Sequence, residues 1–367
     1  MKKLFLSVLL AATLFTGCNK HDNDNSTGDF NITKDAVISD FVNVVALPGY
    51  AELKVKANTL NTAITALNAT TTDENLTAAK NAWKDLRVTW ERCEGFLFGP
   101  IEDDNYDPQT DTWPVNFNDM DALLANNSQG LTVADVSTFP DALKGYHPIE
   151  YILWGEAGTR TAASLTAREK EYMVSLSTLL NTAAQNLNTS WDAGGGNYAN
   201  KFLTAGQPGN STFTTKKAAL LALVQGMVDI CGEVGEGKMK EPFDLFQTNP
   251  TLAAQSVESP FSANSVIDFR NNITGAFNVY LGKFNADGSG LEDLVKARNS
   301  ALDVDLQQKF NAAIASFEAI TLPYERAIAT GPGSQRILCA NTMNAINALS
   351  AELDTELRDF IITNITD

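Results

Sequence analysis

Residues 73–98, DENLTAAKNAWKDLRVTWERCEGFLF, carry the helical pattern from which the fold class can be inferred. Large apolar side chains recur there at the spacing that places them on one broad stripe of an α-helix. These side chains are Leu76, Trp83, Leu86, Trp90 and Leu97. Gly99-Pro100 ends the pattern, as glycine and proline do at a helix stop. Because other elements must cover such a stripe, the stretch predicts a core helix.

The same period recurs along the chain, far more often than the alternation that strands require. Helices are predicted over residues 166–187, 215–240, 262–282 and 335–362. Thr166 and Glu169 have the spacing of a capping box, and Ser262 can cap the helix that follows it. The sequence therefore predicts an all-α protein made of antiparallel helical bundles.

Glycines interrupt the third of these helical patterns. Gly226, Gly232, Gly235 and Gly237 all lie within residues 215–240. Each costs about 1 kcal/mol of helix stability relative to alanine unless a close contact uses it. We therefore expect this helix to be kinked or closely packed.

The length of 367 residues exceeds what one hydrophobic core usually holds. We predict two helical bundles, an N-terminal one over residues 30–200 and a C-terminal one over 201–367. Residues 99–118 and 241–260 form connections long enough to be functional or disordered. The first of them is acidic and contains Asp111-Thr112-Trp113-Pro114, in which Trp113 favours order.

The N-terminus has the layout of an export signal. Lys2 and Lys3 precede an apolar stretch over residues 4–15, which is too short to span a bilayer comfortably. The tetrapeptide FTGC at 15–18 resembles the lipobox at which lipoprotein signal peptides are cut. We therefore predict a signal peptide over 1–17 and a lipid on Cys18. The polar residues 18–29 should form a flexible tether.

Composition narrows the class of partner. The formal net charge is −17 and no basic stripe stands out, which argues against nucleic acid as a partner. Lipidation of Cys18 leaves three cysteines, and none has CxxC spacing. We expect Cys93, Cys231 and Cys339 to be buried thiols, with room for one bridge.

Only one histidine lies in the region expected to fold. His147 belongs to GYHPIEYILWG, residues 145–155, and Pro148 favours a helix that starts with the proline at its first position. His147 would then lie near the N-cap, with Glu150 one turn further. The pair could bind a metal, act as a base with its orienting partner, or simply cap the helix around a buried histidine.

This motif, with three other blocks, resembles the imelysin-like family, whose hallmark is GxHxxE (peptidase M75-like). Gly145, His147 and Glu150 match the motif in full. The other blocks are Trp83 to Pro100, the DTWP turn at 111–114, and ESPFS at 258–262 with Asn264, Ser265, Asp268 and Phe269. The four blocks occur in order and cover nearly all of the predicted mature chain.

The resemblance implies two helical-bundle halves of similar topology with the site in the cleft between them. It also implies export and a link to bacterial iron acquisition. We expect His147 and Glu150 to face a cleft that solvent reaches. The other residues expected at this site are Gly145, Glu94, Asp111, Trp113, Ser262, Asp268 and Arg270.

The donor types available at this site favour a hard cation. His147 is the only nitrogen ligand, whereas catalytic zinc usually has three protein ligands and a water. The remaining ligands must be oxygens, led by Glu150 and Glu94 and followed by Asp111 and Asp268, which suits iron or another divalent or trivalent metal. Haem would require an axial ligand, for which His147 and Tyr146 are the candidates. Arg270 could neutralise a buried carboxylate, bind an anionic ligand or form a surface ion pair.

Three functions remain open from the sequence. The first is a binding lipoprotein of iron or haem acquisition, held by its lipid at the outer membrane on the periplasmic face or the cell surface. The second is a metallopeptidase that uses His147 and Glu150. The third is an interaction protein in which that pair is structural.

Overall fold

The computed structural model describes residues 26–115, 117–329 and 334–366. Helices dominate this part of the chain, and no strand occurs in it apart from one isolated bridge between Lys283 and Asp287. The predicted all-α class is confirmed.

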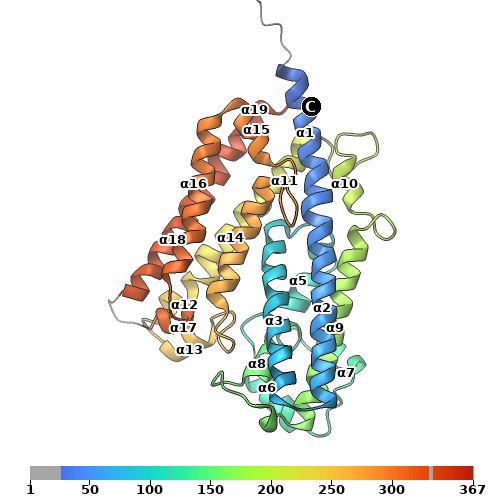
Figure 1. Ribbon diagram of the computed structural model, residues 1–367, viewed down its shortest axis with the longest axis vertical. Coiled ribbons are helices and arrows are strands. Elements are labelled where there is room, and N and C mark those ends of the chain that lie inside the picture. Colours follow the sequence, from blue (N-terminus) through green and yellow to red (C-terminus); the bar gives the residue numbers. More distant parts are fainter. Residues whose placement is uncertain (1–25, 116, 330–333, 367) are drawn as a thin grey trace, which may run out of the picture.

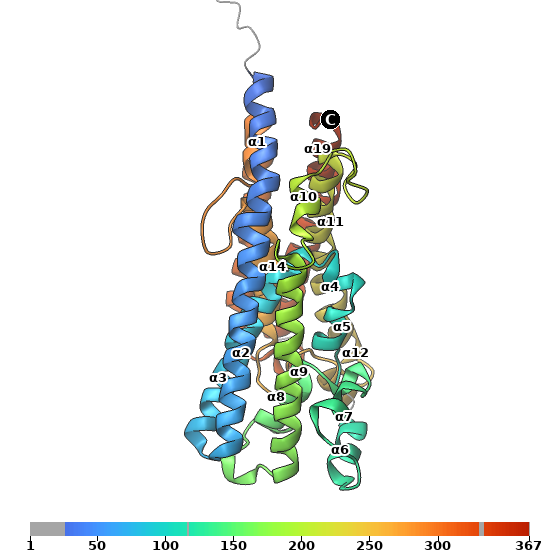
Figure 2. The same cartoon turned by 90° about the vertical axis from the view of Figure 1, so that its right-hand side faces the viewer.

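The first bundle is built on three long helical segments (Figure 1). A continuous rod combines α1, a π-helical turn and α2, and α2 packs against both α3 and α9 (Figure 2). Thr166 and Glu169 form the predicted capping box at the start of α9. The segments are α1 (Ser26–Asp40), η1 (Phe41–Ala46), α2 (Leu47–Ala69), α3 (Asp73–Cys93) and α9 (Ala167–Trp191).

Short helices connect α3 to α9, so the acidic connection over residues 99–118 is ordered along most of its length. They carry two of the predicted motifs, DTWP after α5 and GxHxxE in α8. The elements are η2 (Glu94–Phe96), α4 (Pro100–Asp103), α5 (Tyr106–Asp111), α6 (Phe117–Ala125), α7 (Val133–Ser137), η3 (Asp141–Leu143), α8 (Tyr146–Trp154) and η4 (Ala162–Ser164).

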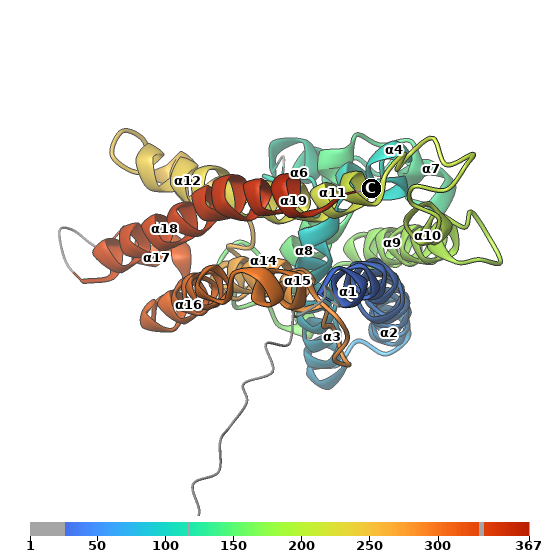
Figure 3. The same ribbon diagram turned by 90° about the horizontal axis from the view of Figure 1, so that it is seen from above.

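The second bundle packs α11, α14, α16 and α18 together. Seen from above, α16 and α18 lie on the side away from α2 and α9, with α14 between them and α3 (Figure 3). Its elements are α11 (Lys216–Gly232), η5 (Glu233–Lys238), α12 (Lys240–Leu245), α13 (Pro250–Gln255), α14 (Ser265–Leu281), α15 (Leu291–Arg298), α16 (Ser300–Ser316), η6 (Phe317–Ala319), α17 (Tyr324–Ala327), α18 (Ser334–Glu352), η7 (Leu353–Leu357) and α19 (Arg358–Asn364).

Glycines allow the two bundles to approach each other closely. A Cβ on Gly275 of α14 would collide with the Arg92 carbonyl of α3, and one on Gly95 would lie 2.9 Å from the Ala276 nitrogen. A Cβ on Gly226 of α11 would lie 2.8 Å from the Gly95 carbonyl oxygen. The expectation of close packing is thus correct for Gly226, and the π-turn η5 supplies the expected irregularity in this helix.

Several predicted boundaries differ from the structure. α1 begins at Ser26, before Phe30, and α10 (Ala199–Leu203) spans the predicted division at residue 200. The Phe202 ring lies 4.9 Å from that of Phe41, so α10 packs on the first bundle. The cap predicted at Ser262 is wrong, because α14 begins at Ser265 and the Ser262 hydroxyl donates to Glu150 instead.

Cys93, Cys231 and Cys339 are free and buried, as expected of core thiols, and the one bridge allowed by the sequence does not form. Cys18 and residues 1–17 lie outside the described part of the chain.

Two continuous helices, Phe30–Ala69 and Lys216–Leu245, have the length and composition of membrane spans, but half of each apolar window is buried in the protein. Such burial is also found in core helices of soluble proteins.

Candidate metal centre

A glycine sets the position of His147. Gly145 has φ +83°, and a Cβ there would collide with the Thr110 carbonyl. It is the N-cap of α8, so His147 is the second helical residue and Pro148 the third. The prediction of Pro148 at the first position is wrong. The helix tolerates the proline because the first-turn N–H groups have no intrahelical partner.

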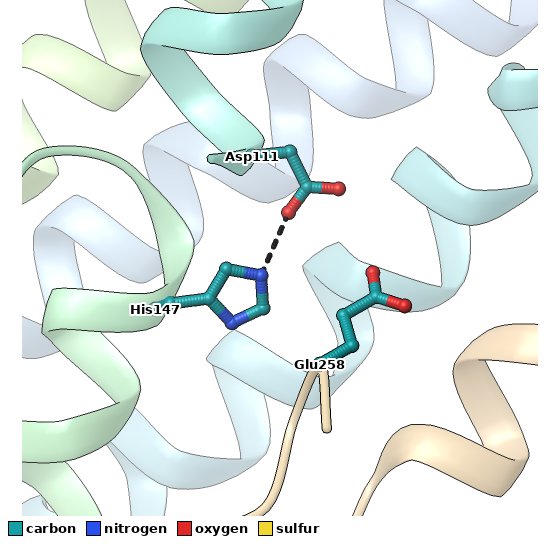
Figure 4. A group of neighbouring side chains, drawn as sticks. All are labelled: Asp111, His147 and Glu258. Carbon is teal, nitrogen blue, oxygen red and sulfur yellow. Dashed lines mark hydrogen bonds and ion pairs between the residues drawn. The ribbon is translucent and has the colours of Figure 1, made fainter. Parts of the chain in front are cut away.

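Both nitrogens of His147 face carboxylates. Nε2 lies 3.1 Å from Asp111 Oδ1 (Figure 4), and Nδ1 lies 3.3 Å from Glu150 Oε2, one turn along α8. Burial lowers the pKa of His147, but the hydrogen bonds to Asp111 and Glu150 outweigh it and raise the pKa to about 9. The ring is therefore an imidazolium at neutral pH, with one nitrogen directed at each carboxylate.

Glu150 joins the two bundles. Its Oε1 accepts hydrogen bonds from the backbone nitrogen of Ser262 at 2.8 Å and from Ser262 Oγ at 2.6 Å. Ser262 lies in the segment before α14, so this predicted residue reaches the site from the second bundle. Glu150 thus orients the imidazole from one side and is itself held from the other.

Asp111 contacts three side chains of the site, those of Arg87, Trp90 and His147. It ends α5, accepts a hydrogen bond from Trp90 Nε1 at 2.6 Å and pairs with Arg87. Burial would raise its pKa, but Arg87 and His147 hold the pKa well below its ordinary value. Asp111 therefore stays ionised, as a metal ligand must.

Arg87 was not among the predicted site residues. It lies on α3 with a fully buried side chain, pairs with Glu91, contacts Glu258 at 2.6 Å and stacks 4.9 Å from the centre of the Tyr146 ring. Its position between Trp83 and Trp90 puts a charge on the apolar stripe of that helix. A charge on a buried face requires a partner, so the sequence itself indicates that Arg87 belongs to a polar site.

Lys238 was also missed. Its fully buried ammonium comes from the π-turn η5 and lies 2.9 Å from Glu94 and 3.3 Å from Glu258. The centre of the Trp113 ring lies 5.3 Å from the Lys238 ammonium, so this predicted residue is at the site, where it contacts the lysine. Burial lowers the pKa of Lys238, but Glu258 and Glu94 outweigh it and raise the pKa above its ordinary value. Nothing in its glycine-rich neighbourhood indicates this role.

The buried site holds more acidic than basic groups. Arg87, Lys238 and the imidazolium of His147 face six carboxyl groups. These are Glu91, Glu94, Asp111, Glu150, Glu258 and Asp268. Burial raises the pKa values of Glu94 and Asp268 well above the ordinary carboxyl range. A bound cation would compete with the protons that burial favours on these carboxyl groups.

Two groups of side chains have the spacing of metal ligands. One atom from each of Asp111, His147 and Glu258 lies within 4.8 Å of the others (Figure 4), and the same holds for Glu91, Glu94 and Asp111. Ligands on opposite sides of one Ca²⁺ ion lie about 4.6–5.2 Å apart, so both groups are compact enough for an ion. Of the predicted ligands, His147 belongs to the first group and Glu94 to the second. Glu150 instead binds the imidazole.

Of two further predicted residues, Asp268 lies at the site and Arg270 does not. Asp268 lies at the site, accepting hydrogen bonds from Ser259 and Asn264 with its Oδ2 3.8 Å from Arg87 Nε. Arg270 does not lie there, because its half-exposed side chain faces Glu318 at 3.5 Å. Two residues along a helix turn the side chain by about 200°, which directs Arg270 away from the face that carries Asp268.

The expected solvent-reachable position of His147 and Glu150 is wrong. Their exposures are 1% and 0%, and Ser262 closes over Glu150. A groove of about 850 Å³ lies on the other side of this closure, between the bundles. Tyr151, Phe261, Ser262 and Glu325 are among the residues that line it. Ser262 therefore separates the groove from the buried carboxylates.

Comparison with known proteins identifies the family of this chain. The imelysin family model matches residues 46–353. Iron-regulated protein A of Synechococcus elongatus is 31% identical over 354 residues, covering 94% of this chain and 90% of that protein. The crystal structure of a putative iron-regulated protein A precursor from Parabacteroides distasonis superposes with a TM-score of 0.76 at 25% identity, covering 88% and 95% of the two chains.

An imelysin-like protein from Psychrobacter arcticum has the same fold, with a TM-score of 0.70 at 13% identity over 89% of this chain and 94% of that one. The family model matches most of the chain, and its range includes α8. The chain belongs to the imelysin family.

Proposed function

We propose that this protein binds iron as a bare cation at Asp111, His147 and Glu258 and serves bacterial iron acquisition. The observation that carries the proposal is Glu258, which is 1% exposed and whose Oε2 has no hydrogen-bond partner among the described residues. A buried carboxylate oxygen without a donor costs free energy, and a bound cation would remove that cost.

The donor set suits iron. One imidazole with two carboxylates provides one nitrogen and several hard oxygen ligands, as ferric and ferrous ions accept. Glu150 would hold the ring through Nδ1 while Nε2 faces the ion, after losing its proton. The names of the relatives, iron-regulated protein A and its putative precursor, support a role connected with iron.

Burial favours a bare cation over haem. Nε2 of His147, the atom that would bind a haem iron, is in hydrogen-bond contact with Asp111. Tyr146, the other axial candidate, is 1% exposed with its ring against Arg87. Neither side chain has space beside it for a porphyrin.

The same burial disfavours a metallopeptidase. A peptide bond would have to reach His147, which is 1% exposed. The candidate ligand groups also contain one nitrogen donor, whereas the established catalytic zinc sites use two or three histidines or cysteines. Binding therefore explains the site better than cleavage does.

The groove between the bundles is the proposed approach for the ion. Carboxylates of Asp121, Glu156 and Glu325 line it and are accompanied by one guanidinium, that of Arg326. This balance attracts cations. Ser262 would have to release Glu150 for an ion to pass from the groove into the centre.

We further propose that a lipid on Cys18 holds the protein at the outer membrane. The apolar N-terminal stretch is compatible with a signal sequence, and FTGC at 15–18 supplies the acceptor cysteine. Replacing Cys18 with Ser should move the protein from the membrane fraction to the soluble exported fraction. Continued membrane association of the variant would disprove the anchor.

Calorimetric titration tests the binding site. Anaerobic Fe²⁺ should bind the chelator-treated protein, and His147→Ala and Glu258→Gln should each weaken binding at least tenfold. Glu318→Gln is the matched control, because its side chain is mostly exposed at the surface pair with Arg270. If the control and both site variants bind equally, the proposed site is wrong.

A further inference from the structure

The ammonium of Lys238 lies in a cage of carboxylates. Its Nζ is 2.9 Å from Glu94 Oε2, 3.3 Å from Glu258 Oε1 and 3.7 Å from both Glu91 Oε2 and Glu233 Oε1. The side chain is fully buried, so water does not compensate these acids at the ammonium. The position among these carboxylates is therefore already occupied by a cation, the ammonium of Lys238.

Two of these carboxylates also belong to the second ligand group. Glu91, Glu94 and Asp111 have ligand atoms within 4.8 Å of one another, and Asp111 is shared with the group that contains His147. Two-metal sites in proteins place their ions about 3.5–4 Å apart with ligands between them. Asp111 has the position of such a bridging ligand.

We propose that Glu91, Glu94 and Asp111 form a second cation position and that the ammonium of Lys238, paired with Glu91 and Glu94, occupies it. The centre thereby holds one metal ion where its carboxylates would otherwise suit two. The inference rests on the proposed function, because the first position is the iron site at Asp111, His147 and Glu258. Lys238 is then the residue that sets the number of ions bound.

The local backbone supports this role. Lys238 is the last residue of the π-turn η5, and such turns occur frequently at functional sites. The Trp113 ring, in the segment between α5 and α6, lies 5.3 Å from Nζ and adds a favourable contact for a cation. Asn272 Nδ2 contributes a neutral donor, at 2.5 Å from Glu91 Oε2.

A single substitution should open the second position. Lys238→Ala removes the ammonium and leaves space among three buried carboxylates, so this variant should bind two Mn²⁺ ions per chain. The unaltered protein should bind one. Lys238→Arg keeps the charge and should bind one, as should Lys240→Ala, which alters a neighbouring lysine that is 46% exposed.

Stoichiometry and spin coupling are the measurements. Equilibrium dialysis counts the ions, and electron paramagnetic resonance detects the coupling of two Mn²⁺ ions held close together. One uncoupled ion in Lys238→Ala, with one in the unaltered protein, overturns the second position but leaves the iron site standing. No ion in the unaltered protein overturns the proposed function itself.

Loss of folding in the variant is also informative. Removing Lys238 leaves buried carboxylates uncompensated, which destabilises a protein strongly. If Lys238→Ala is unfolded without metal, millimolar Mn²⁺ should restore its helical circular dichroism with two ions bound. Failure of Mn²⁺ to restore the fold, or restoration with one ion, contradicts the proposal.

Discussion

Glu150 lies between His147 and Ser262, accepting from the imidazole with one oxygen and from the serine with the other. The Nδ1–Oε2 distance to His147 is 3.3 Å, and the Oγ–Oε1 distance to Ser262 is 2.6 Å. His147 belongs to the first bundle and Ser262 to the second. The orientation of the candidate ligand therefore depends on how the two bundles are docked.

The first prediction concerns the hydrogen bonds of Glu150 to His147 and Ser262. Ser262→Ala removes one of the two donors to Glu150 Oε1, and Glu150→Gln removes the charge that holds the ring. Loss of a residue that orients a metal ligand typically weakens metal affinity by about 10–100-fold. Calorimetry with Fe²⁺ should show this loss for Glu150→Gln and a smaller one for Ser262→Ala. Unchanged affinity in both would show that Glu150 does not orient the ligand.

The second prediction compares two arginines. Arg87 has a fully buried side chain among four carboxylates, whereas the side chain of Arg270 is 48% exposed beside Glu318. Arg87→Met should lower the free energy of unfolding by about 3–5 kcal/mol, because it leaves buried carboxylates uncompensated. Arg270→Met should change it by less than about 0.5 kcal/mol. Urea denaturation measures both values, and similar losses in the two variants would contradict the assigned burial of Arg87.

The third prediction concerns the contact between the bundles. A Cβ on Gly275 collides with the Arg92 carbonyl, so Gly275→Ala must push α14 from α3 and should cost about 1–3 kcal/mol. Gly232 is the matched control, since a Cβ there meets no atom within 4 Å and lies in a helix. Gly232→Ala should therefore stabilise the protein by about 0.5–1 kcal/mol. A stabilising Gly275→Ala would refute the close approach of the helices.

The sequence predicts the parts of this structure that depend on local spacing. The period over residues 73–98 identifies α3 and its buried face, and the capping box identifies the start of α9. The motif around His147 identifies one side of the site. Each of these signals lies within a few turns of the chain, where residue spacing determines which side chains share a face.

The remainder of the site depends on contacts between distant segments. Glu258 and Lys238 reach Arg87 and Glu94 across more than 140 residues, and no local period encodes those pairs. Arg270 lies two residues from Asp268 in sequence, but helical geometry separates their faces, so sequence proximity does not bring Arg270 to the site. Arg87, by contrast, carries a local signal, because it places a charge on the apolar stripe of α3.

The fourth prediction uses Asp107, a partly buried carboxyl on α5 outside both ligand groups. Burial, with the charges of Asp111 and Glu233, raises its pKa to about 7 from the model-peptide value of 3.8. Between pH 4 and 7 the folded protein therefore binds a proton that the unfolded chain has released. Stability falls as the pH rises through this window and the effect is complete above it.

Asp107→Asn removes this loss, because the amide does not ionise. In metal-free protein, the variant and the unaltered chain should have similar melting temperatures near pH 4, and the variant should melt higher at pH 8. Asp104→Asn is the control, because Asp104 is an exposed carboxyl directly after the end of α4. This variant should keep the pH dependence of the unaltered chain. A constant difference between Asp107→Asn and the unaltered protein from pH 4 to pH 8 would mean that Asp107 titrates alike in both states, and its burial would then carry no electrostatic cost.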